Sequence, residues 1–294
     1  MTIQSRVSRK SMLFLTLLAA AIGCLLCLAG RADARVYWAL LGGFGGEGEI
    51  GRANLDGSGK DRHFIHGAVG PVAIAVDDRH VYWINADGGT IGRARLDGSK
   101  VDQDFIDGIG GFPRDLTVAD GYIYWTIGET VQAPASIARA KLNGTGVDLD
   151  FIAFDQPADF STPTEIEVQG GYIYWTNAYP VYTIARARVD GSELDQSFIT
   201  GLKNPFGLAV TDSYLYWGNR GTHSISRASI DGTGTEIDFI PDTGRIGSIA
   251  ADERFLYWPH DDDIIRARLN GSKVKTLIPH APAYSVAVDG LGPR

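Results

Sequence analysis

The chain has 294 residues, of which 44% are hydrophobic and 21% are charged, so it can build a packed core and is not a disordered polypeptide. Its formal net charge of -8 at pH 7 argues against nucleic acid as a partner, because binding to phosphates requires a basic surface. The two cysteines, Cys24 and Cys27, lie together near the N-terminus, which excludes a disulfide scaffold and a multi-cysteine metal site.

The first segment has the features of an export signal. A basic start within residues 6–10 precedes an apolar run at 12–30, and the small-x-small sequence Ala32-Asp33-Ala34 follows it. We expect residues 1–34 to be a signal peptide that is cleaved after its last alanine. The apolar run is also long enough to span a bilayer, so an uncleaved membrane anchor is the alternative, and a lipid attached to Cys24 is a weaker one.

A Tyr-Trp pair recurs along the remaining chain, and it accounts for every tryptophan. Successive pairs are separated by 45, 42, 50, 42 and 41 residues. The pairs begin at Tyr37, Tyr82, Tyr124, Tyr174, Tyr216 and Tyr257.

Three further phrases recur between these pairs, typified by residues 91–99, 104–106 and 205–210. Each phrase is rich in aromatic and β-branched residues or alternates apolar with polar residues, which predicts a β-strand. Four short strands in a unit of about 40 to 45 residues is the pattern of a β-propeller blade. An Asp-Gly or Asn-Gly pair follows the second phrase in every repeat, and we expect a two-residue type I′ hairpin turn there. These pairs begin at Asp56, Asp97, Asn143, Asp190, Asp231 and Asn270.

The phrases resemble the low-density lipoprotein receptor class B repeat, called YWTD after its strand motif. The resemblance spans residues 36–289 and implies an all-β fold, a six-bladed β-propeller of four-stranded antiparallel blades. The aspartate of the motif is absent from every repeat, and Asn85, Asn177 and Asn219 replace it in three of them. No cysteine-rich module flanks the repeats. The resemblance therefore implies the fold, in a stand-alone exported form of prokaryotic style, and not receptor-type partners.

The two ends of residues 35–294 indicate how the propeller closes. The first repeat begins at its Tyr-Trp strand and lacks the strand that precedes this pair elsewhere. Residues 283–289 match that missing strand and have no Tyr-Trp pair after them. We expect the C-terminal strand to become the innermost strand of blade one, which removes the open end of the array.

Residues that occur once in every repeat are expected to be scaffold. The six tryptophans should pack between blades, and one arginine per repeat should pair with a polar group of a neighbouring strand. These arginines are Arg52, Arg93, Arg139, Arg186, Arg227 and Arg266.

Function is expected on the face that carries the loops after each Tyr-Trp strand and the loops before each inner strand. We call it the loop face; these loops vary between repeats, and binding residues usually lie on variable loops of a rigid frame. Phe112 and Phe154 also lie there and are not required by the repeat. The expected ligand-binding residues are Arg114, Phe160, Tyr179, Tyr182, Phe206 and Tyr284.

Three carboxylates, Asp115, Glu165 and Glu167, fall at the mouth of the central channel, where a hard cation such as calcium binds. Six-bladed lactonase-type and strictosidine-synthase-like enzymes are similar in shape and work at this mouth, the former around a metal ion. A metal-dependent lactonase, hydrolase or lyase is therefore the alternative function. The exported chain has no serine elbow and no cysteine nucleophile, and we find no catalytic constellation.

The sequence thus favours a non-enzymatic, extracytoplasmic and monomeric binding scaffold. Its partner is expected to be a protein or another ligand of the cell envelope, with no required cofactor and no nucleic acid. Contact with a membrane is expected only if the N-terminal segment is retained.

Overall fold

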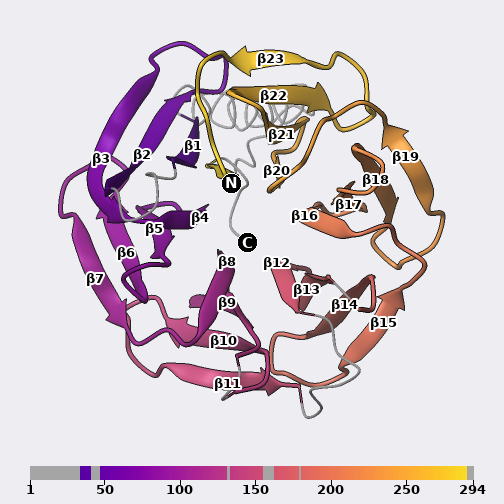
Figure 1. Ribbon diagram of the computed structural model, residues 1–294, viewed down its shortest axis with the longest axis horizontal. Coiled ribbons are helices and arrows are strands. Elements are labelled where there is room, and N and C mark those ends of the chain that lie inside the picture. The colour runs from indigo at the N-terminus through magenta and orange to yellow at the C-terminus, as the bar shows by residue number, and fades with distance from the viewer. Residues whose placement is uncertain (1–33, 41–46, 131–132, 155–161, 179, 290–294) are drawn as a thin grey trace, which may run out of the picture. The chain divides into compact units, whose positions relative to one another are not determined.

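The computed structural model describes residues 34–40, 47–130, 133–154, 162–178 and 180–289. The predicted signal segment lies outside these residues, apart from Ala34. Residues 35–289 form an all-β unit of six four-stranded antiparallel sheets arranged as the blades of a propeller (Figure 1). No helix that would be long and apolar enough to cross a membrane occurs among the described residues.

Each blade runs from a strand that lines the central channel to a strand at the rim (Figure 1). The inner strands are β4 (Pro71–Val76), β8 (Phe112–Ala119), β12 (Pro163–Gln169), β16 (Pro205–Val210), β20 (Ala250–Ala251) and β24 (Ser285–Val288). The Tyr-Trp strands are β1 (Arg35–Leu40), β5 (His80–Asn85), β9 (Tyr122–Gly128), β13 (Tyr172–Asn177), β17 (Tyr214–Asn219) and β21 (Phe255–His260).

The third and fourth strands complete each blade. The third strands are β2 (Glu47–Asn54), β6 (Thr90–Arg95), β10 (Ser136–Lys141), β14 (Thr183–Arg188), β18 (Ser224–Ser229) and β22 (Asp263–Arg268). The outer strands are β3 (Asp61–Val69), β7 (Asp102–Asp107), β11 (Asp148–Ala153), β15 (Asp195–Ile199), β19 (Glu236–Ile240) and β23 (Lys275–Ile278).

The C-terminal strand closes the ring, as the sequence predicts. Strand β24 pairs antiparallel with β1, with Trp38 opposite Val286, so blade one has the strand order β24-β1-β2-β3. The amide of Asp289 donates to the Arg35 carbonyl at 3.0 Å, and the Tyr37 hydroxyl donates to the Asp289 carboxylate at 3.2 Å. Both ends of the propeller chain therefore meet in a single sheet.

The six tryptophans are buried between blades, which confirms their predicted role as scaffold. Trp125, for example, packs in a cluster that joins strands of blade two with strands of blade three. In two blades the neighbouring strand carries glycine opposite the indole, and a Cβ at Gly51 or Gly92 would lie 2.2 Å from the ring of Trp38 or Trp83. Burial of a whole indole against the next blade is the main apolar contribution to each interface.

Four of the repeated arginines link their blade to the next. Arg52 Nη1 donates to the Leu96 carbonyl of blade two at 2.8 Å, and its guanidinium carbon lies 3.8 Å from the centre of the Phe64 ring. Arg93 repeats the arrangement one blade further, donating to the Leu142 carbonyl at 3.2 Å. The predicted structural role is confirmed for these four, whose polar partner is a backbone carbonyl of the adjacent blade, whereas Arg227 pairs with the Glu236 carboxylate of its own blade.

The Asp-Gly and Asn-Gly pairs do not form type I′ turns, so that expectation was wrong. In blade two the amide of Gly98 donates to the Arg95 carbonyl at 2.8 Å, and only the glycine has positive φ, at 87°. The Asp97 carboxylate accepts the Ser99 amide at 2.8 Å, which fixes the aspartate in the ordinary negative-φ region. The turn is therefore a type I turn followed by a left-handed glycine, a geometry that also suits a hairpin.

Deleting residues 284–289 should prevent folding or cause aggregation. Without β24 the Trp38 interface loses its cover and β1 becomes an unpaired edge. The measurement is thermal unfolding followed by circular dichroism, with a control chain that ends at Asp289 and keeps the whole strand. A truncated chain that melts at the same temperature as the control would show that closure does not stabilise the propeller.

Candidate functional site at the mouth of the central channel

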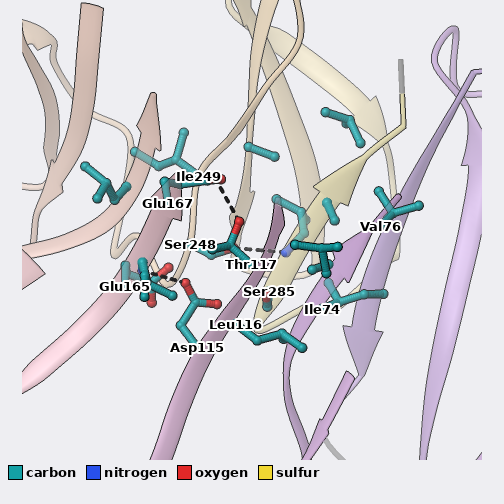
Figure 2. A pocket seen from close by; sticks show the side chains of 18 of the residues that line it. Ile74, Val76, Asp115, Leu116, Thr117, Glu165, Glu167, Ser248, Ile249 and Ser285 are labelled. Atoms are coloured by element: carbon teal, nitrogen blue, oxygen red, sulfur yellow. Dashed lines mark hydrogen bonds between the residues drawn. The ribbon is translucent and has the colours of Figure 1, made fainter. Parts of the chain in front are cut away.

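The inner strands enclose a cavity of about 40 Å³ in the central channel. Figure 2 shows the carboxylates of Asp115, Glu165 and Glu167 on one side of it, with Ile74 and Val76 on the opposite side. A water molecule needs roughly 10 to 15 Å³ on this measure, so the cavity has room for a few waters.

The acidic side chains come from adjacent blades and from equivalent positions. In β8 and β12 the register shifts between the proline and the residue three places later, which forms a bulge at Asp115 and at Glu165. The threonine after each tryptophan secures this bulge. Thr126 Oγ1 accepts the Asp115 amide and Thr176 Oγ1 accepts the Glu165 amide, both at 3.1 Å.

The other four blades carry small or hydroxyl side chains at this position. Every second residue of an inner strand faces the channel, so equivalent residues of the six blades line it in two rings. The first ring contains Ala73, Asp115, Glu165, Gly207, Ser248 and Ser285. The second ring contains Ala75, Thr117, Glu167, Ala209, Ala250 and Ala287. Blades three and four therefore supply all the charge of these rings.

Hydrogen bonds join the two acidic blades across the channel wall. Asp115 Oδ2 accepts the amide of Ile166 at 2.9 Å, and Thr117 Oγ1 donates to Glu167 Oε2 at 3.2 Å (Figure 2). The predicted carboxylates thus lie on one wall.

Burial dominates the electrostatics of this wall. It raises the pKa of Asp115 to about 8, and the Glu167 carboxylate adds to the rise, whereas the hydrogen bond from the Ile166 amide opposes it. Burial also raises the pKa of Glu165 well above its usual range, with Asp115 contributing next, although Arg220 and Arg114 act in the opposite direction. Asp115 is therefore largely protonated at neutral pH, and a protonated carboxyl group can donate a hydrogen bond or a proton.

Arginines and aromatic rings surround the mouth above this wall. Arg220 lies over the Phe206 ring at 3.2 Å and donates to the Ile246 carbonyl at 3.1 Å. Burial lowers the pKa of Arg220, opposed by the neighbouring Tyr284, while Arg245 lowers it further. The sequence analysis missed Arg220 and Arg245 because both lie in loops outside the recurring phrases.

The predicted ligand-binding residues differ in their exposure and in their place in the fold. Arg114 is exposed at the mouth, Tyr284 is half-buried beside it, and Phe206 is only 7% exposed beneath Arg220. Tyr182 is half-buried and packs against the core between blades four and five. Tyr179 and Phe160 lie outside the described residues, so these two stay predictions.

Two further aromatics of the loop face have opposite environments. Phe154 is 3% exposed and stacks on Trp175 at 5.9 Å between ring centres, so it belongs to the core. Phe112, at the start of β8, is 61% exposed. Phe112 and Arg114 therefore present an aromatic ring and a cation to solvent from one strand.

The carboxylates of the channel do not converge as a metal site requires. Within the described ranges, a single group of three or more histidine, aspartate or glutamate side chains has ligand atoms all within 4.8 Å of one another, and it consists of Glu49, His63 and His66 in blade one. Calcium takes six to eight oxygen ligands. Asp115, Glu165 and Glu167 do not provide such a set in this geometry, so calcium binding there stays a prediction.

The raised pKa of Asp115 gives a pH dependence with a defined sign. Because the folded state holds the proton up to about pH 8 and the unfolded state releases it near 3.8, the folded state binds more protons between these values. The free energy of unfolding should therefore fall as pH rises through this window, by at most about 1.4 kcal/mol per pH unit for one proton. Asp115→Asn should flatten this dependence and stabilise the protein at pH 8.

Urea unfolding at pH 5 and pH 8 measures the effect, with the exposed Asp78→Asn as a matched control. An Asp115→Asn variant with the same pH dependence as wild type would mean that Asp115 is ionised in the folded protein.

Comparison with known proteins identifies the repeat. The model of the low-density lipoprotein receptor repeat class B matches residues 171–210, which contain β13 to β16. No curated protein matches the chain in sequence.

Solved structures share the fold. A chain of the crystal structure of a nidogen/laminin complex aligns with a TM-score of 0.73 and 22% identity, over 87% of this chain and 98% of that one. A gluconolactonase from Xanthomonas campestris aligns with a TM-score of 0.60 and 19% identity, over 74% and 77% of the two chains. For virginiamycin B lyase from Staphylococcus aureus the values are 0.56 and 20%, over 76% of each chain.

Identities this low establish the architecture and not an activity, because the matched proteins have different activities on the same fold. The blade phrases, the closed ring and the matched segment lead to one conclusion: the chain is a six-bladed β-propeller that carries a low-density lipoprotein receptor class B repeat.

Proposed function

We propose that this propeller is an exported, non-enzymatic binding scaffold that holds an acidic segment of a cell-envelope protein at the channel mouth of its loop face. Export rests on the signal-like residues 1–34, which lie almost wholly outside the described part. The proposal is independent of whether that segment is cleaved or kept as an anchor.

One observation carries the proposal: exposed Phe112 and Arg114 stand on the same strand of blade three, and Arg220 and Arg245 add two further cations that influence each other in the loops of blades five and six. Aromatic and arginine side chains are the usual energetic centres of protein interfaces, and arginine pairs well with carboxylates. The chain as a whole is acidic, so a concentration of arginines at one mouth is a local feature that favours an acidic partner.

The channel itself supports a surface function better than catalysis within it. Its cavity of about 40 Å³ has room for only a few water molecules. Inner-strand residues of all six blades line this cavity, so side chains or strands would have to move apart before it could hold a larger ligand. A partner that contacts the rim needs no such movement.

Charge reversal at the mouth tests the proposal. Arg114→Glu combined with Arg245→Glu should reduce the amount of partner captured from a cell-envelope extract by about tenfold or more, because two attractive contacts become repulsive. Both side chains are exposed, so the melting temperature should stay within about 2 °C of wild type. Capture is quantified by pull-down and mass spectrometry.

The matched control is Arg79→Glu, which changes another exposed arginine, in the turn between β4 and β5 on the opposite face. If Arg79→Glu abolishes capture and the mouth variant binds normally, the partner uses the other face. Equal capture by all three proteins would remove the electrostatic basis of the proposal.

A hydrolase or lyase is the second candidate, and the buried Asp115–Glu165 pair is the observation that favours it. Carboxyl groups whose pKa is raised by burial are typical of general acids, and they lie here at a channel mouth. If calcium is bound as the sequence suggests, one tightly held equivalent should appear in elemental analysis of the purified protein. Glu165→Gln should then remove it, whereas a metal-free wild-type protein counts against the metal-dependent enzyme.

A further inference from the structure

Blade one departs from the repeat at three positions that meet in space. Glu49 is the residue before the repeated isoleucine of the third strand, where four other blades carry a hydroxyl side chain. The equivalents of Glu49 are Thr90, Ser136, Thr183, Ser224 and Asp263. His63 and His66 flank the Phe64–Ile65 pair of β3, and no other blade has a histidine at either position.

The hydroxyl side chains at this position fasten the third strand to the outer strand. Thr90 Oγ1 donates to the Gln103 carbonyl at 2.8 Å, and Ser136 Oγ donates to the Leu149 carbonyl at 2.7 Å. Glu49 has no hydroxyl group to donate, so the fastening of the third strand to the outer strand does not explain a glutamate at this position. Its carboxylate instead faces the two imidazoles, because His63 Nδ1 lies 2.5 Å from Oε2 and His66 Nδ1 lies 3.3 Å from Oε1.

The backbone of blade one is adapted to this arrangement. Residues three apart in a regular strand point to opposite sides, yet the rings of His63 and His66 stack at 5.7 Å with an angle of 7° between their planes. Blade one has a second register shift between its third and outer strands, between Gly48 and Glu49, that the described residues of the other blades lack, and Gly67 takes a φ of 76° there. These irregularities bring both rings to the same side as the carboxylate.

A contact from blade two supports this geometry. Gln103 Nε2 donates to the His66 carbonyl at 2.9 Å, and Gln103 itself accepts the Trp83 indole N–H at 3.0 Å. The backbone of His66 is thereby joined to a residue that the propeller core holds in place.

We propose that Glu49, His63 and His66 form a binding site for a divalent transition-metal ion, with Zn²⁺ as the cation that fits best. Two imidazole nitrogens and one carboxylate are a ligand set that zinc uses with a fourth position left open. Ligands at about 2 Å from a tetrahedral ion lie roughly 3.3 Å apart. The three ligand atoms already lie within 4.8 Å of one another.

Small side-chain movements complete the coordination. The His63 nitrogen must move away from the carboxylate by about 1 Å to reach the spacing of zinc ligands, whereas His66 is already there. Both rings are free to do this, because their side chains are 64% and 68% exposed. The ion joins β2 to β3 in the blade that closes the ring, and its open position faces solvent, where water or a partner's side chain binds.

Isothermal titration calorimetry with zinc chloride tests the site, using the purified chain without a polyhistidine tag. One saturable equivalent is expected, and His63→Ala or His66→Ala should each weaken binding about tenfold or more. His223→Asn and His280→Asn are matched controls, since both histidines are exposed and asparagine tolerates their left-handed backbone. These controls should bind zinc as wild type does.

Cobalt(II) supplies an independent readout of the ligands. Its visible absorption is strong in four-coordinate sites and weak in six-coordinate water complexes, so wild type should give the strong spectrum and Glu49→Gln should not. An excess of calcium should leave the spectrum unchanged, because imidazole nitrogens favour transition metals over calcium.

The outcomes separate this site from the channel mouth. Loss of zinc binding in Asp115→Asn, with full binding in His63→Ala, would assign the ion to the channel and overturn the proposal. No saturable binding by wild type would mean that Glu49 only accepts hydrogen bonds from two histidines. The Arg114→Glu and Arg245→Glu variant should keep zinc binding whatever its effect on partner capture.

Discussion

The strongest polar link between blades is a recurring one, in which the third-strand arginine of blades one, two, three and six donates to a backbone carbonyl of the next blade. Arg52 and Arg93 make this bond while each guanidinium lies on the outer-strand phenylalanine of its own blade. Arg266 does the same from blade six to the Leu55 carbonyl of blade one, at 2.5 Å, so the contact also spans the seam of the ring. A charged donor held between an aromatic face and a carbonyl fixes the angle between blades as well as their separation, which burial of apolar surface alone does not.

Strict repetition of the scaffold separates structural residues from those with another role. A side chain that every blade carries is explained by the ring, whereas a position where a single blade differs needs its own account. The carboxylates of the channel occur in blades three and four, at positions where the other blades have alanine, glycine or serine. The Glu49, His63 and His66 cluster occurs in blade one, where it replaces a hydroxyl that elsewhere fastens two strands.

The sequence predicts the architecture well because each strand has its own phrase and because the missing first strand reappears at the C-terminus. It also places Asp115, Glu165 and Glu167 on the channel, since a fixed offset from the phrase sets their position. The turn type was not predictable from the Asp-Gly pair, because both turn types favour it and the choice depends on the aspartate accepting the amide two residues later. Arg220 and the pairing of Glu49 with two histidines were missed because loop packing and a bulge in register decide them.

Burial of Asp115 and Glu165 has a cost that the fold must offset elsewhere. An alanine or serine at either position, as in other blades, would line the channel without raising any pKa. The fold supplies a backbone donor to Asp115, and the Arg220 and Arg114 cations lower the pKa of Glu165 without cancelling the effect of burial. The same cations form the basic rim of the mouth. Arg220 is fixed there by the Phe206 ring and the Ile246 carbonyl, so a positive charge stays close to the buried Glu165 at this end of the channel.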